Sequence, residues 1–479
     1  MTQISATGLT NSEQATLTTI VDQIESHREY NERREAYYEG SKRVRQLGIA
    51  IPPKLADVAT VVGWPGMAVD VLEERLDLES FSLPDGDVAD LGLDQVWSDN
   101  HLETESGQAH LPTLMHGISF VTVSAGVEAD GEPPVLVTVE PPTRMSGVWD
   151  TRARRLSSAA SVQWDKEAGR YTAATLYLAD QTIFLEAPAG GGMLRVVHRA
   201  RHGLGRPLVV PLVNRPRVGR PWGRSEISRA IMSYTDSAVR TLLGMEIHRE
   251  YYSSPQLALM GVAEEAFVNS DGSAKTAWEV YLGRVLALTR DEDGELPQVQ
   301  QLSAGSPAPY LEQVRGLANL VAGEAAIPAS YLGFVTDNPS SADAIRVSEA
   351  RLVKRAERRQ RIFGSAWCEV MRMALLVRDG TVPPEARSLV ARWRDAATPT
   401  RAAQADAVMK LVSAGVLPAN SEVTYELLGY DRTTINRLSA EARKIRTEQM
   451  LNGLLSQPGP DGQVSALTAR GAADVDDAE

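Results

Sequence analysis

Cysteine is almost absent from this chain of 479 residues. The single cysteine, Cys368, excludes an internal disulfide and a cysteine-based metal cluster. No run approaches the roughly 18 apolar residues that a membrane-spanning helix needs. The first residues have neither the basic start nor the apolar core of a signal peptide. We therefore expect a soluble, intracellular protein, of about two to four domains, whose stability comes from packing.

Positive charge is also in short supply. The 49 Lys and Arg residues are outnumbered by 62 Asp and Glu residues, which leaves a formal net charge of -13. Proteins that hold nucleic acid tightly usually present a basic surface that displaces counterions from phosphate. The charge balance therefore disfavours tight, static binding of DNA, although it is compatible with a surface that DNA slides past without sticking.

The motifs of common enzyme classes are missing as well. No phosphate-binding loop of the form GxxxxGK[ST] is present, and the glycines of residues 202–207 have neither its spacing nor its strand-to-helix context. The GxSxG elbow of serine hydrolases and the HExxH helix of zinc proteases do not occur. We expect a protein without enzymatic activity and without a cofactor.

Three features could bind metal or react, and each has a simpler interpretation. His198 and His202 stand four residues apart, but their surroundings are rich in β-forming and turn-forming residues, so we interpret them as solvated or loop histidines. The acidic loop 291–295 lacks the ligand pattern of a calcium loop and is interpreted as a charged hairpin tip. Cys368, beside Trp367, is expected to be a small core residue. No metal site is therefore expected.

The N-terminal part of the chain is predicted to be helical. Thr10 precedes Glu13 by three residues, the spacing of a capping box, and a helix is predicted over residues 11–30. A second helical stretch is expected to stop near Gly48, because two prolines follow it. A third helix is predicted over residues 67–76.

From about residue 112 to residue 215 the pattern changes to β. Runs of β-branched and aromatic residues alternate with turns that contain glycine, proline or aspartate. The clearest hairpin turn spans residues 165–170, between Trp164 and Tyr171. An antiparallel, β-rich domain is predicted here.

Two helices then flank a small insert. Apolar residues recur at helical spacing over residues 227–252 and again over residues 310–321. Short apolar runs and the Asp-Gly pair of loop 291–295 predict a small α/β module between these helices. Proline and glycine residues predict an irregular loop over residues 329–341.

A long helix is predicted from about Ser341 onward. Its apolar stripe consists of Ile345, Leu352, Ala356, Phe363, Trp367, Val370 and Ala374. Gly364 is the expected position of a bend, since glycine weakens a helix interior by about 1 kcal/mol. The remaining chain is expected to be helical, with one helix ending at Gly415, and its acidic tail, residues 456–479, is expected to be disordered.

The most basic stretch of the chain lies on this long helix. Residues 346–361 contain seven Lys or Arg residues and two Glu residues. We predict a basic helix face formed by Arg351, Lys354, Arg355, Arg358 and Arg359. Two interpretations stay open: a solvated or interfacial side of an amphipathic helix, or a ring of basic side chains that faces phosphate or the carboxylates of a neighbouring subunit.

The order of these elements resembles that of the portal proteins of tailed bacteriophages. The resemblance covers nearly the whole chain and is carried by VVGWPGMAVDVLEERL, PWGRSEIS and IPASYLGFVTDNPSSADAIRVSEARLVKRAERRQRIF. It implies an α+β, portal-type fold with long stem helices, an antiparallel β-rich wing, a small α/β clip and an α-helical crown. The implied parts are wing helices 1–78, β-rich wing 79–222, first stem helix 223–254, clip 255–303, second stem helix 304–328, tunnel loop 329–341, long kinked helix 342–382, crown 383–455 and tail 456–479.

The same resemblance implies a function at the unique vertex of the capsid. Subunits of this family form a ring, usually a dodecamer, through which double-stranded DNA is packaged and ejected. The implied partners are other copies of the chain, the terminase large subunit, a head-tail adaptor, the major capsid and scaffolding proteins, and the passing DNA, with no membrane. The protein would occur in the virion and, during assembly, in the host cytoplasm.

Two groups of site residues follow from the resemblance. The narrowest part of the tunnel is expected at Val335, Thr336, Asp337, Asn338, Pro339, Ser340 and Ser341. The contact with the motor or adaptor is expected at the acidic clip residues Asp291, Glu292, Asp293 and Glu295. Neither group is a catalytic, metal-binding or cofactor-binding site.

Two other functions stay open. The chain could be another structural component of a virion, such as an adaptor or a minor capsid protein, although a small adaptor has no room for the helix, insert, helix, loop and long helix in this order. It could also be a DNA-processing enzyme such as a terminase subunit. That enzyme would need a phosphate-binding loop or a cluster of metal-binding carboxylates.

Overall fold

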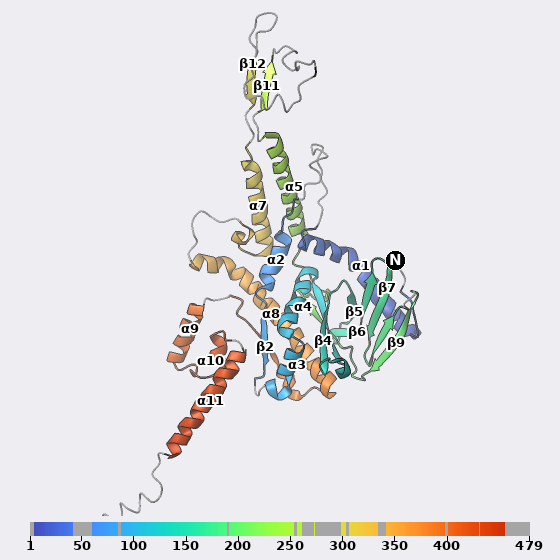
Figure 1. Ribbon diagram of the computed structural model, residues 1–479, viewed down its shortest axis with the longest axis vertical. Helices are drawn as coiled ribbons and strands as arrows, with labels where there is room; N and C mark the ends of the chain where they lie inside the picture. The colour runs from blue at the N-terminus through green and yellow to red at the C-terminus, as the bar shows by residue number, and fades with distance from the viewer. Residues whose placement is uncertain are drawn as a thin grey trace, which may run out of the picture. The chain divides into compact units, whose positions relative to one another are not determined.

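The computed structural model describes residues 4–41, 60–84, 88–188, 191–252, 256–260, 273, 298–302, 306–333, 342–397, 401–430 and 432–455 (Figure 1). The chain divides into two compact units. The first unit comprises Met1–Ser26, Leu72–Arg224 and Ala350–Glu479, and the second comprises His27–Val71 and Ser225–Glu349. No helix of the described residues is both long enough and apolar enough to cross a membrane.

The larger sheet of the first unit has six strands in the order β1-β9-β8-β7-β6-β5. Its strands are β1 Ala6–Thr7, β5 Met145–Asp150, β6 Arg155–Asp165, β7 Arg170–Tyr177, β8 Gln181–Glu186 and β9 Leu194–Arg201. All neighbours are antiparallel except β1, which runs parallel to β9. Trp164 lies opposite Tyr171, so the hairpin turn predicted at residues 165–170 is confirmed.

Helix α1, Asn11–Tyr38, covers this sheet with its N-terminal half. Four buried apolar residues of this half recur at helical spacing and pack against apolar side chains of β6, β7 and β8. They are Leu17, Ile20, Val21 and Ile24. The helix is longer than predicted, because nothing before Gly40 interrupts it; Gly40 then adopts a φ of 66°. The first two predicted helical stretches are thus joined as far as Tyr38.

The start of α1 is fixed by a reciprocal cap. The backbone N–H of Glu13 donates to Thr10 Oγ1 at 3.3 Å, and that of Thr10 donates to Glu13 Oε2 at 2.8 Å. Arg199 on β9 donates from both terminal nitrogens to the two Glu13 carboxylate oxygens, at 2.8 and 2.9 Å. This guanidinium lowers the pKa of Glu13 to about 2. The predicted capping box is confirmed, and through Arg199 it also joins the helix to strand β9.

A second, three-stranded sheet has the order β10-β3-β4. Its strands are β3 Ile118–Ala125, β4 Val135–Glu140 and β10 Val209–Val213. Helices α3 Leu93–Asp99 and α4 Leu102–His116 precede it, and α4 packs against it. The sequence patterns did not predict these two helices. Pro112 lies inside α4, and the polar residues that α4 buries obscure its apolar stripe.

Helix α8, Ala342–Asp379, is one uninterrupted helix. The predicted apolar stripe is buried apart from Ile345, which is 48% exposed. A Cβ at Gly364 would lie 2.9 Å from Trp393 Nε1 and 3.1 Å from Ala391 Cβ. The helix therefore needs glycine at this position because strand β13, Val390–Trp393, approaches closely. Strand β13 pairs with β2, Leu78–Ser82. The chain around β13 was predicted to be helical, and that prediction is wrong for these residues.

An aromatic cluster joins α4, α8 and β13. The His110 ring lies 5.3 Å from the Phe363 ring and 5.4 Å from the Trp393 ring. Trp367 Nε1 donates a hydrogen bond of 2.9 Å to His110 Nε2. Because Nε2 accepts, the proton of the neutral ring lies on Nδ1. Burial lowers the pKa of His110 to about 3, so the ring stays neutral around neutral pH.

The C-terminal helices are α9 Arg401–Ser413, α10 Glu422–Leu427 and α11 Arg432–Leu455. Gly415 adopts a φ of 71° just after α9, as expected of a residue that ends a helix. Helix α10 lies in the part of the chain that was predicted to be helical, although its bounds were not predicted; Ser421 caps it by accepting from the Thr424 N–H at 3.2 Å. Short 3₁₀ turns occur at Val88–Leu91, Glu128–Asp130 and Pro384–Ser388.

The second unit contains two paired helices, α5 Arg229–Tyr252 and α7 Ala308–Ala325. They lie side by side in Figure 1, and the Tyr310 ring of α7 stands 5.6 Å from the His248 ring of α5. The unit also contains α2 Trp64–Glu73, the 3₁₀ turn Ala329–Leu332 and an antiparallel pair, β11 Gln256–Met260 with β12 Gln298–Leu302. Helices were predicted at all three α positions.

Candidate functional site on helix α8 and the loop after strand β10

The predicted basic face of α8 is exposed in part. Arg351, Lys354 and Arg358 are exposed, and Arg355 is half-buried. Together with the exposed Arg361, the exposed residues are spaced by three, four and three positions, which places them along one side of the helix. Lys354 Nζ lies 3.2 Å from Glu357 Oε2. The exposed side is therefore a stripe of positive charge with one internal ion pair.

Arg359 is separated from this stripe by burial. Its side chain is only 5% exposed, and Nε donates a hydrogen bond of 3.2 Å to Asn214 Oδ1. Nη1 also donates to the Arg355 carbonyl oxygen at 3.1 Å. A buried guanidinium is tolerated where polar partners replace water. Arg359 thus connects α8 to the end of β10.

Asn214 is the centre of a backbone junction. Its N–H donates to the Gly117 carbonyl at 2.9 Å, and its side-chain Nδ2 donates to the Arg224 carbonyl at 2.7 Å. The Arg224 N–H donates in turn to the Asn214 carbonyl at 2.8 Å. Gly223 has a φ of 69°, and a Cβ there would lie 2.3 Å from the Asn214 carbonyl oxygen. Only glycine fits this position.

The sequence patterns missed Asn214, because its partners are distant in the sequence. The glycine in the stretch PWGRSEIS was the one available signal, since Gly223 lies where the chain approaches Asn214. A glycine in a sequence does not by itself reveal which backbone it approaches. The junction could be located only from the folded chain.

His198, His202 and Cys368 contact neighbouring side chains and backbone and form no metal site among the described residues. The His198 ring lies 5.9 Å from the Phe184 ring, and His202 Nδ1 accepts from the Leu204 N–H at 3.2 Å. Cys368 is buried, and burial raises the pKa of its thiol. Within the described part of the chain, no three His, Cys, Asp or Glu residues come together as metal ligands. The expectation that Cys368 is a core residue is confirmed.

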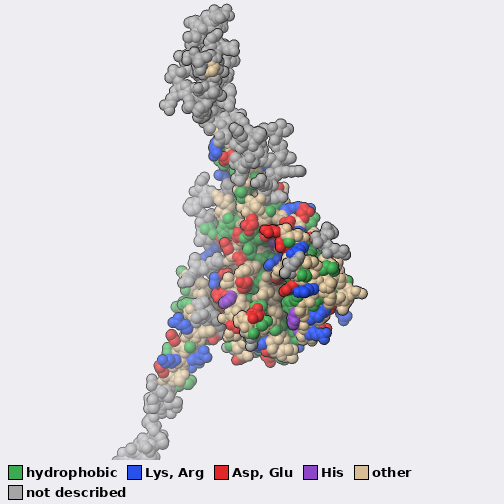
Figure 2. Space-filling view, turned by 45° about the vertical axis from the view of Figure 1, so that its right-hand side comes forward, with side chains coloured by type: hydrophobic (Ala, Val, Ile, Leu, Met, Phe, Trp, Pro, Cys, Tyr) green, Lys and Arg blue, Asp and Glu red, His purple; other side chains and the backbone are tan. Residues whose placement is uncertain are grey.

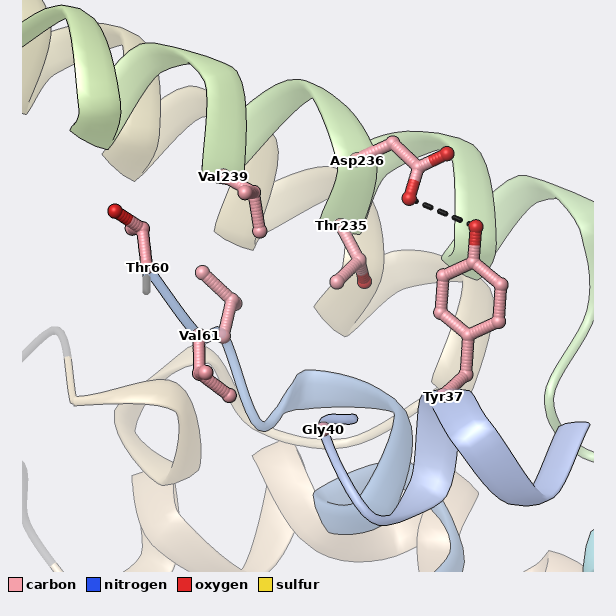
Figure 3. A pocket seen from close by; sticks show the side chains of 8 residues that line it. Tyr37, Gly40, Thr60, Val61, Thr235, Asp236 and Val239 are labelled. Atoms are coloured by element: carbon pink, nitrogen blue, oxygen red, sulfur yellow. Dashed lines mark hydrogen bonds between the residues drawn. The ribbon is translucent and has the colours of Figure 1, made fainter. Parts of the chain in front are cut away.

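A small hollow lies between α1 and α5 in the second unit (Figure 3). Tyr37 donates a hydrogen bond of 2.7 Å from its hydroxyl to Asp236 Oδ1. Burial and the Asp236 carboxylate raise the pKa of Tyr37. Thr60, Val61 and Val239 supply small side chains around the pair. The Tyr37–Asp236 contact fixes two helices against each other, and we assign it to packing.

The other predicted site residues lie outside the described residues. These are the tunnel-loop residues Val335, Thr336, Asp337, Asn338, Pro339, Ser340 and Ser341, and the clip residues Asp291, Glu292, Asp293 and Glu295. Figure 2 shows carboxylates and basic side chains interspersed over the visible face.

The sequence resembles known phage proteins along most of its length. Residues 17–443 match the family described as "Phage portal protein, SPP1 Gp6-like". The portal proteins of Mycobacterium phages L5 and D29 are each 38% identical to it, over 392 and 390 residues, or 80% of this chain and 79% of each relative. A solved structure described as the virion of a native gene transfer agent particle has a TM-score of 0.43 and 14% identity, over 76% of this chain and 89% of that one.

The sequence matches define a structural component of a phage particle. The chain belongs to the phage portal protein family. The resemblance stated from the sequence is therefore confirmed, and a portal role replaces the alternatives of an adaptor, a minor capsid protein or a terminase subunit.

The burial of Arg359 leads to a stability prediction. Replacement of Arg359 by methionine should leave Asn214 Oδ1 buried without its donor and should lower the free energy of unfolding by about 1–3 kcal/mol. The matched variant Arg358→Met changes the same charge at an exposed position and should stay within about 0.5 kcal/mol of the parent. Urea denaturation followed by tryptophan fluorescence measures both, and equal losses would contradict the distinction.

Proposed function

We propose that the chain is one subunit of a closed ring at the unique capsid vertex, and that double-stranded DNA passes through the ring during packaging and ejection. The observation that carries this proposal is the family match over residues 17–443. In the proposal α5 and α7 are the stem helices, residues 255–303 form the clip, and residues 383–455 form the crown.

Exposed apolar residues on α7 support a ring. Leu311 and Leu320 are 52% and 51% exposed, and Leu320 lies on the side of the helix opposite the buried residues Ala318 and Ala322. In a closed ring, one face of each subunit meets a different face of the next. A second subunit would remove these leucines from water, which favours association by roughly 25 cal/mol for each Å² of apolar surface.

The charge of the chain supports a channel that does not grip DNA. Each firm phosphate contact adds to affinity and would have to be broken at every step of translocation. A net charge of -13 opposes such contacts. We place the narrowest point at residues 335–341, where Asn338, Ser340 and Ser341 would offer weak, exchangeable hydrogen bonds.

Energy for translocation must come from a partner in this proposal, since the sequence contains no phosphate-binding loop. We assign that role to the terminase motor, docked on the clip, with the head-tail adaptor replacing it afterwards. Major capsid and scaffolding proteins would surround the ring in the virion, after assembly in the host cytoplasm.

The ring itself is directly observable. Negative-stain images of the purified protein, or of material released from particles, should show closed rings with a central hole, and sedimentation should give one discrete oligomer. A protein that stays monomeric even within assembled particles would rule out the proposal.

The tunnel-loop assignment predicts a selective defect. Deletion of residues 335–341 should leave ring assembly intact but reduce packaged DNA by at least about tenfold, because the narrowest contact with the duplex is lost. Nuclease-protected DNA in particles is the measurement. Deletion of seven residues from the tail, 470–476, is the control, and normal packaging by the tunnel-loop deletion would refute the assignment.

The clip assignment predicts a docking defect. Replacement of Asp293 and Glu295 by lysine should weaken binding of the terminase large subunit or the adaptor in a pull-down, because rim charges set association rates and their salt dependence. The same reversal at Glu167 and Glu186, which are exposed on the β-rich part of the first unit, should have no effect. Unchanged binding by the clip variant would remove these residues from the interface.

A further inference from the structure

A tight hairpin rich in arginine follows strand β10. Residues 215–224, here called the arginine hairpin, contain four arginines and no carboxylate. Arg217 and Arg220 exchange two backbone hydrogen bonds, with N···O distances of 3.3 Å and 2.8 Å. Gly219 has a positive φ of 79°, whereas Val218 does not have a positive φ, which is the pattern of a type II turn. The tip of the hairpin is therefore a defined turn.

The arginine hairpin is both anchored and exposed. Asn214 and Arg224 close its base through the backbone junction described above. Arg217, Val218 and Arg220 are exposed, Val218 completely so. A rigid, exposed turn loses little conformational entropy when it binds a partner.

The two central arginines lie directly opposite each other. Side chains of opposite residues in a hairpin project from the same face, and like charges in such positions destabilise the pair. Neither Arg217 nor Arg220 forms an ion pair with another described residue. An anionic group between them would relieve the repulsion. The geometry thus calls for a partner that carries carboxylates or phosphates.

The same unit carries a surface of opposite charge. Residues 88–105, here called the acidic surface, span the 3₁₀ turn Val88–Leu91, helix α3 and the start of α4. The segment itself contains no Lys or Arg residue, and its carboxylates are Asp90, Asp94, Asp99, Glu103 and Glu105. Arg378 of α8 donates to the Leu91 carbonyl at 2.9 Å, but its charge is paired with Asp379. Asp94 and Glu103 are exposed, and neither pairs with a basic residue among the described positions.

Glu103 of the acidic surface does not meet the arginine hairpin within one described chain. Gly117, at the end of α4, contacts the Arg224 backbone at the base of the hairpin. Glu103 lies at the other end of α4, roughly 20 Å away at 1.5 Å per residue. Glu103 and the arginine hairpin therefore do not satisfy each other's charge.

We propose that the arginine hairpin of one subunit binds the acidic surface of the adjacent subunit. This inference rests on the proposed ring, in which every contact joins two different faces of the same chain. Arg217 and Arg220 on one region and Asp94 and Glu103 on the other supply the complementarity. Duplex DNA could also attract the arginines, but the chain itself provides the matching surface, and firm phosphate contacts would hinder translocation.

Cross-linking tests which two regions meet. Val218→Cys and Thr104→Cys introduce thiols at exposed positions in the two regions and preserve every charge; the native Cys368 is buried. In assembled rings, a short bis-maleimide should give a ladder of linked subunits with the double variant and none with either single variant. The pair Val218→Cys with Ala168→Cys is the control, because Ala168 is exposed on the β6–β7 turn.

Charge reversal with rescue tests the interaction itself. The variant Arg217→Glu/Arg220→Glu should weaken ring assembly about tenfold at low salt, and adding Asp94→Arg/Glu103→Arg should restore it. Arg152→Glu/Arg154→Glu changes the same net charge on another exposed turn and should assemble normally. Mass photometry at two salt concentrations measures the assembled fraction.

The outcomes separate this inference from the proposed function. Rings of the wild-type chain without a ladder, or a reversal that has no effect or is not rescued, would overturn the contact and leave the portal ring in place. Loss of duplex binding with unchanged assembly would reassign the hairpin to DNA. Absence of rings from the wild-type chain and from particles would overturn both.

Discussion

The contact between His110 and Trp367 is the constraint on which the rest of the first unit depends. It holds α4, α8 and β13 together, because the indole N–H needs an acceptor in the core and only a neutral imidazole supplies one. A charged ring would place two donors face to face in a buried site. The close approach at Gly364 follows from the same packing, since β13 lies directly against the helix there.

The part of α8 that belongs to the first unit, from Ala350 onward, is therefore held in place, and its polar residues make different contacts according to the side of the helix on which they lie. Arg359 lies at the edge of the buried stripe and donates to Asn214, whereas Arg358, one position earlier, is exposed. Asn214 in turn fixes the base of the arginine hairpin through Arg224. A chain of hydrogen bonds thus leads from the helix to an exposed basic turn.

Sequence patterns predicted those features of the fold that depend on residues close together in the chain. The Thr10–Glu13 cap, the turn at residues 165–170 and the buried stripe of α8 were all recoverable from spacing. Strand β13 was not, since its partner β2 lies about 300 residues earlier in the chain. The burial of Arg359 was missed for the same reason, because charge and helical periodicity do not reveal a distant amide acceptor.

Closure of the proposed ring would lower the binding free energy that each contact between subunits has to contribute. An exposed ion pair contributes about 0–1 kcal/mol, too little to hold two subunits alone. A subunit within a closed ring is held by two interfaces at once, so each needs only a share of the total. Apolar contacts such as those of Leu311 and Leu320 would then provide affinity. Pairs of arginines and carboxylates would determine how adjacent subunits are aligned. Because the chain is acidic overall, the arginine hairpin can serve the contact between subunits while the channel still does not bind DNA firmly.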